Sequence, residues 1–184
     1  MVEVLERGDI RFFYRPVVQA VGDLEGRPGV QSFFVVLGRA DGTHRRIRVG
    51  RKRLPNPSER LWARVERVGS FARVLGDQLD DERYTTKTRG ERIQPAAAAI
   101  AEGSYAFVRH DDHVHLVYRV EHPEPDVPDE VRVPDEGSHV VLFERVPRTS
   151  ATWTTAGDPA HLDEGSELVL VGIEDELGMD VLPA

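Results

Sequence analysis

The strongest constraint on the fold is a pair of apolar runs on either side of Asp111-Asp112. Apolar and polar side chains alternate through both runs, which is the period of a β-strand. With the two aspartates as the loop of a tight hairpin, His110 lies directly opposite His113. One face of this hairpin is apolar enough to enter a core, and it consists of Tyr105, Phe107, Arg109, Val114, Leu116, Tyr118 and Val120. We therefore expect a sheet with one face packed inward.

Further apolar runs, separated by turn residues, predict more strands along the chain. They cover residues 9–14, 30–37, 44–49, 60–69, 84–89, 138–146 and 167–173, while residues 94–101 fit either a short helix or an extended connector. Ser70 is a favoured N-cap, and the apolar spacing after it predicts a helix over 71–79. The expected architecture is a single α+β domain over residues 1–184, mainly antiparallel β, barrel-like or two-layered, with one short helix.

The composition fits a globular chain that needs no crosslinks. Of the 184 residues, 40% are hydrophobic and none is cysteine, which excludes a disulfide scaffold and thiolate chemistry. No run approaches the roughly 18 apolar residues of a membrane span, and the first residues lack the features of a secretory signal. We therefore expect a cytoplasmic protein without a membrane partner.

Charge is divided unevenly along the chain, whose formal net charge is -8. Residues 1–122 hold 21 basic and 17 acidic residues, whereas residues 123–184 hold 3 basic and 15 acidic ones. The asymmetry indicates an anionic partner for the first part, or an acidic segment that covers a basic surface such as the tract 51–53. We expect a solvated, acidic and proline-rich connection over 123–137 and an acidic tail over 174–184. Solvation alone is the competing explanation.

Three of the seven histidines share the second face of the predicted hairpin. A His-x-His pair on one strand and a third histidine on its neighbour can bind zinc and leave a position open for water. Residues opposed across a hairpin lie about 5 Å apart and diagonal ones about 7 to 8 Å, so the imidazoles can converge. The predicted metal ligands are His110, His113 and His115, with a divalent metal such as zinc as the cofactor. Ordinary hydrogen-bonding strand histidines are the alternative.

A basic segment precedes this hairpin in the sequence. The β-branched run from Tyr84 to Arg89 predicts a strand with Thr85, Lys87 and Arg89 on one side, turned by residues 90–92. Because arginine and lysine bind phosphate, the predicted ligand-binding residues are Lys87, Arg89, Arg92 and Arg109. If the two segments meet in the fold, His113 or His115 would act as acid or base in cleaving a phosphoester.

No signature of a known catalytic class accompanies these residues. The sequence lacks a phosphate-binding P-loop, a dinucleotide fingerprint, a His-Glu-x-x-His helix and a nucleophile elbow. The aromatic run at residues 12–14 would suit stacking on single-stranded nucleic acid, but its alternation is more typical of a core strand. The net acidic charge also counts against a dedicated nucleic-acid binder.

Four segments together resemble a family of uncharacterised proteins found in bacteria and plants. They are residues 11–16 (RFFYRP), 49–55 (VGRKRLP), 84–92 (YTTKTRGER) and 109–118 (RHDDHVHLVY), and the resemblance spans roughly residues 8–122. It implies no activity and no catalytic residue, because none is established for that family.

Three classes of function follow from the sequence. The first is an enzyme or binding module for a phosphorylated or nucleic-acid ligand, with the basic residues and the histidines in one site. The second is a three-histidine metal-binding protein. The third is an interaction module that uses its acidic C-terminal third to engage a basic partner.

Overall fold

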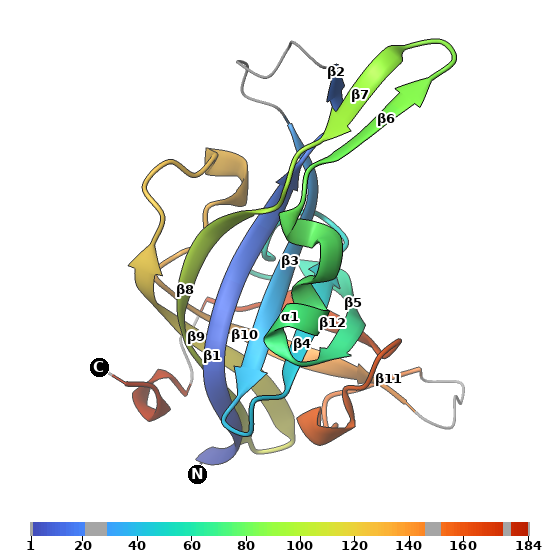
Figure 1. Ribbon diagram of the computed structural model, residues 1–184. Coiled ribbons are helices and arrows are strands. Elements are labelled where there is room, and N and C mark those ends of the chain that lie inside the picture. The colour runs from blue at the N-terminus through green and yellow to red at the C-terminus, as the bar shows by residue number, and fades with distance from the viewer. Residues whose placement is uncertain (1, 21–28, 146–151, 175–177, 184) are drawn as a thin grey trace.

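A computed structural model describes residues 2–20, 29–145, 152–174 and 178–183. Within these residues, eight antiparallel strands close a barrel in the order β1-β3-β4-β5-β12-β10-β9-β8, with β8 paired to β1 (Figure 1). The expectation of a mainly antiparallel, barrel-like sheet with one short helix is confirmed, since α1 is the α-helix of the described chain.

Two four-stranded meanders make the barrel. The first consists of β1 (Val2–Pro16), β3 (Val30–Arg39), β4 (His44–Val49) and β5 (Arg60–Gly69). The second consists of β8 (Ala98–His110), β9 (His113–Pro123), β10 (Glu136–Glu144) and β12 (Glu167–Gly172). A short strand, β11 (Trp153–Thr154), pairs with the end of β10. An Asp-Gly turn, Asp41-Gly42, joins β3 to β4, and Gly42 has a φ of 88° that glycine tolerates.

The connection between the two meanders carries the helix and a projecting arm. Ser70 caps α1 (Phe71–Leu75), its hydroxyl accepting from the amide of Arg73 at 3.2 Å. The helix was expected to reach residue 79, but Gly76 has a φ of 52°, so the chain continues as a 3-10 turn, η1 (Gly76–Leu79). Beyond it, β6 (Glu82–Thr86) and β7 (Gly90–Gln94) form a hairpin that pairs with β2 (Gln19–Ala20). This hairpin is called the β6–β7 arm below.

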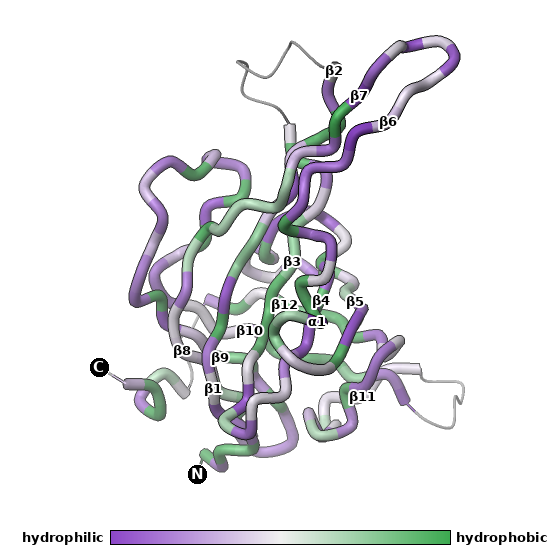
Figure 2. The backbone as a smooth tube through the Cα atoms, in the orientation of Figure 1, coloured by the Kyte–Doolittle hydropathy of each residue, from purple (hydrophilic) through white to green (hydrophobic). Residues whose placement is uncertain are grey.

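Alternation along each strand fills the barrel with apolar side chains. The interior includes Ile10, Phe12, Phe33, Phe107 and Tyr118, all almost fully buried. Hydrophobic residues concentrate in the barrel strands, whereas the outer part of the β6–β7 arm is largely hydrophilic (Figure 2). Residues 94–101, which fitted a helix or a connector, form no helix: Gln94 ends β7, and residues 98–101 are the first of β8.

Short 3-10 turns cover the barrel from outside the strands. Most residues of the connection over 123–137 are exposed or half-exposed, but η2 (Asp129–Val131) buries Val131, and Val127 joins it on the core. The other turns are η3 (Pro159–His161) and η4 (Met179–Val181). In the tail over 174–184, Met179 and Leu182 pack on the outer face of β8 and β9, while residues 175–177 and 184 lie outside the described chain. Among the described helices, none is long and apolar enough to cross a membrane.

Candidate functional site

The histidine hairpin has the register that the sequence predicts. His110 pairs with His113 and Val108 with His115, and Asp111 adopts a φ of 56° in the two-residue turn. Aspartate tolerates this left-handed conformation better than most residues, which explains how Asp111-Asp112 replaces the more usual Asn-Gly. The apolar face enters the barrel, so the three histidines lie on the outer face.

The three imidazoles are close neighbours but differ in their surroundings. The ring centroids of His110 and His115 are 6.4 Å apart, with the planes nearly perpendicular. The Nδ1 atom of His113 lies 2.6 Å from a carboxylate oxygen of Asp112, and that of His110 lies 3.6 Å from Asp111. His115 is buried, and its Nδ1 has no hydrogen-bond partner among the described residues. Burial lowers the pKa of His115, and the neighbouring histidine charges lower it further.

The arrangement does not present a ready ligand set for a metal ion. Across the described residues, no group of three or more histidine, aspartate or glutamate side chains is placed to hold one. His110 and His113 each face an aspartate of the turn instead, a contact that stabilises the hairpin. Metal binding at His110, His113 and His115 therefore stays a hypothesis without geometric support.

The predicted basic ligand residues do not join the histidines. Lys87 and Arg89 belong to the β6–β7 arm, at one end of the barrel, whereas Val2 pairs with His110 at the other end (Figure 1). Arg109 lies at the histidine end, where its Nη1 donates to Glu3 at 3.0 Å. The chain therefore does not assemble one site from the histidines and the basic segment.

The basic segment also differs in detail from the expected strand. Lys87 and Arg89 were expected on one side of a strand over 84–89, but β6 ends at Thr86 and both residues lie in the turn. The Thr86 hydroxyl accepts a hydrogen bond from the Arg89 amide at 2.9 Å, which closes the turn. Residues 90–92 were expected to turn the chain and instead begin β7. Both cations are consequently presented at the tip of the arm.

The root of the arm is fixed to the barrel by a buried arginine. Arg15 donates from Nε to the carbonyl oxygen of Pro95 at 3.0 Å and from Nη2 to that of Asp80 at 3.0 Å. The side-chain amide of Gln94 donates to the carbonyl oxygen of Pro16. These bonds hold both strands of the arm to the end of β1, so its direction is set by the barrel.

Sequence reasoning missed a buried polar network inside the barrel. Arg45 donates to Glu6 at 2.6 Å and to the carbonyl oxygens of Leu162 and Pro159, while the Tyr105 hydroxyl donates to Glu6 at 2.7 Å. Burial raises the pKa of Tyr105, and the Glu6 charge adds to this shift. The signal was present in the alternation, since Arg45 has the same parity as the core residues of β4.

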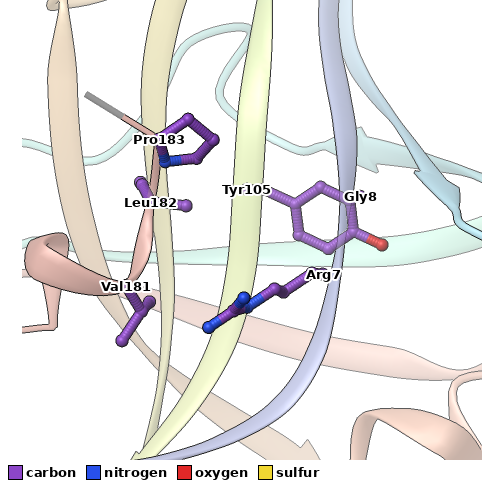
Figure 3. Close-up of a pocket in the computed structure, with 6 residues that line it drawn as sticks. All are labelled: Arg7, Gly8, Tyr105, Val181, Leu182 and Pro183. Atoms are coloured by element: carbon purple, nitrogen blue, oxygen red, sulfur yellow. The ribbon is translucent and has the colours of Figure 1, made fainter.

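A surface pocket of about 320 Å³ lies between β1, β8 and the C-terminal segment. Figure 3 shows Arg7, Gly8 and Tyr105 on one side and Val181, Leu182 and Pro183 on the other. Arg7 is the charged residue among these six, and the Tyr105 hydroxyl donates its hydrogen bond to Glu6. The lining holds no pair of acid and base, so the pocket adds no catalytic arrangement to the described chain.

One of the three cations in the basic tract 51–53 is paired with a carboxylate that lies close in the sequence. Arg53 forms a two-bond pair with Glu59, which lies outside the acidic C-terminal third, and the same contact lowers the pKa of Glu59 to about 2. Arg51 and Lys52 are exposed.

Comparison of the chain with models of protein families, with curated proteins and with solved structures finds no match.

Proposed function

We propose that the protein binds a phosphorylated polymer, such as a nucleic acid, through the β6–β7 arm. The observation that carries the proposal is the exposure of Arg83, Lys87 and Arg89 on a hairpin that projects from the barrel (Figure 1). None of the three forms a salt bridge within the described residues. Cations left free on a projecting hairpin suit an external anion better than internal packing.

Local charge supports the proposal although the whole chain is acidic. The arm over 82–94 holds four basic and two acidic residues, against a net charge of -8 for the chain. Interactions between exposed charges weaken beyond about 10 Å at moderate salt, so the local surplus decides what the arm attracts. Threonine hydroxyls at 85, 86 and 88 lie among the cations, and hydroxyl and basic side chains are the usual phosphate contacts.

The shape of the arm favours an extended ligand. A two-stranded ribbon can enter a nucleic-acid groove or lie along a phosphate backbone. Its root is fixed by Arg15, so the ordering cost on binding falls mainly on the tip. The proposal is one of binding and not of hydrolysis, because His113 and His115 lie at the opposite end of the barrel.

Fluorescence anisotropy with a labelled oligonucleotide tests the proposal over a range of salt concentrations. The variant Lys87→Gln with Arg89→Gln removes two charges at the tip, so the slope of log K against log salt should fall by about 1.5. The matched control, Arg7→Gln with Arg109→Gln, removes two charges away from the arm and should keep the wild-type slope. Equal slopes for the arm variant and wild type would refute the proposal.

A further inference from the structure

The outer face of β5 carries an unusually exposed tryptophan. Trp62 is 44% exposed, although the strand buries its neighbours Leu61 and Ala63 inside the barrel. Alternation places Trp62 outside together with Arg60 and Arg64, two residues away on either side. On the adjacent strand β12, Val169 lies opposite Trp62 and is half-buried. The face therefore combines one large aromatic ring with flanking cations.

A second basic segment lies beside the same ring. The Gly50 amide donates to the carbonyl oxygen of Trp62 at 2.9 Å, and a Cβ on Gly50 would lie 3.4 Å from the indole Cε3 atom. The indole thus rests beside a residue without a side chain. Arg51 and Lys52 follow Gly50 directly, and both are exposed.

The cations around Trp62 are only partly neutralised. Arg48 lies opposite Arg64, and like charges in this position destabilise a sheet. Glu66 pairs with Arg48 and Arg46, and Glu59 pairs with Arg53, so these carboxylates are already engaged.

Four of these cations form no salt bridge within the part of the chain that the structure describes. Glu167 lies opposite Arg64 on β12, yet the two form none within 4.0 Å. Among the described residues, the same holds for Arg51, Lys52 and Arg60.

We propose that Trp62 is a stacking platform for a base of single-stranded nucleic acid, with Arg51, Lys52, Arg60 and Arg64 contacting the flanking phosphates. This inference rests on the proposed function and names its ligand class. Single strands are favoured because their bases are free to stack on an aromatic ring, whereas those of a duplex are stacked on each other.

The position of the platform agrees with the position of the arm. Val49 of β4 pairs with Phe33 of β3 and with Ala63 of β5. Because Val30, at the start of β3, pairs with Pro16, the start of β5 and the root of the arm belong to the same end of the barrel. The histidine hairpin lies at the other end. One extended strand of nucleic acid could therefore contact both Trp62 and the arm. Each contact would then contribute separately to the free energy of binding.

Tryptophan fluorescence tests the stacking directly. The chain has two tryptophans, and Trp153→Phe leaves Trp62 as the reporter. Titration of this variant with a single-stranded oligonucleotide should quench the emission with the midpoint that anisotropy gives. Because base stacking on an aromatic ring is worth about 1 to 3 kcal/mol, Trp62→Ala should weaken oligonucleotide binding roughly 5- to 150-fold. Trp62→Phe should recover part of the loss.

Polyphosphate, which has charge but no bases, separates stacking from charge. Trp62→Ala should bind it as wild type does, whereas Arg60→Gln with Arg64→Gln should lower the salt slope for both ligands. Unchanged oligonucleotide affinity in Trp62→Ala, with the arm variant still weakened, would overturn the platform and leave the proposed function standing. If duplex DNA bound with the same affinity as the single-stranded oligonucleotide, and Trp62→Ala weakened both equally, the choice of single strands would be overturned. A wild-type protein that binds neither ligand would contradict both proposals.

Discussion

Replacing His139 by leucine should make the barrel less sensitive to acid. His139 lies inside the barrel and is 7% exposed, and within the described parts of the chain neither of its ring nitrogens has a hydrogen-bond partner. It borders a cavity of about 10 Å³ whose other lining residues are almost all apolar, including Phe12 and Leu170. Burial lowers the pKa of His139 from 6.5 to about 4, because the charged imidazolium would lose its hydration there.

The direction of the pH effect follows from this lowered pKa. Above about pH 6.5 the histidine is neutral in both the folded and the unfolded chain, so its protonation does not affect stability. Between about pH 6.5 and pH 4 the unfolded chain binds the proton and the folded chain does not, so the free energy of unfolding decreases as pH falls. The complete loss amounts to about 3 kcal/mol, or a decrease in Tm of roughly 6 to 12 °C.

Urea unfolding of wild type and His139→Leu, at a series of pH values from about 7 to about 4, measures this difference. The leucine variant should lose about 3 kcal/mol less than wild type over the series, and it should match or exceed wild type at neutral pH because two unpartnered nitrogens are removed. His122→Leu, at an exposed position, is the control and should keep the wild-type pH dependence. Parallel pH curves for wild type and His139→Leu would refute the reasoning.

Three further predictions concern stability and use thermal or chemical unfolding. Ser70→Ala removes the cap of α1 and should cost about 1 kcal/mol; an unchanged midpoint would show that the cap is not needed. Arg45→Met leaves Glu6 buried with its best partner gone and should cost about 3 to 5 kcal/mol, a value that a fully solvated pair would not reach. Gly8→Ala would place a Cβ against the carbonyl oxygen of Gly38 and should prevent stable folding, so a variant with wild-type Tm would contradict the packing of β1 on β3.

The elements that the sequence predicts well are those determined by neighbouring residues. The register of the histidine hairpin depends on two turn residues and on alternation, and both lie within one short segment. The start of α1 depends in the same way on Ser70. Closure into a barrel was only one of two expected architectures, because it depends on pairing between β1 and β8, which are far apart in the chain.

The parts that the sequence does not predict depend on partners distant in the chain. Alternation places Arg45 on the core side of β4. Its hydrogen-bond partners, however, are Glu6 of β1 and the carbonyl oxygens of Pro159 and Leu162 in the loop before β12, and all of them are distant in the sequence. In the arm, by contrast, a local contact was missed. The β-propensity of residues 84–89 predicted a strand through Arg89. A local hydrogen bond from the Arg89 amide to Thr86 ends that strand instead.

The barrel has two seams between its halves, one where β1 meets β8 and one where β5 meets β12. Each half is a continuous meander, and the only covalent link between the halves in the chain is the helix and the arm over residues 70–97. A cut at the tip of the arm would leave two four-stranded sheets with unpaired edges, and each sheet would be the complementary template for the other. The protein is therefore suited to reconstitution from two fragments. If each fragment is fused to one of two interacting proteins, assembly of the barrel reports their association.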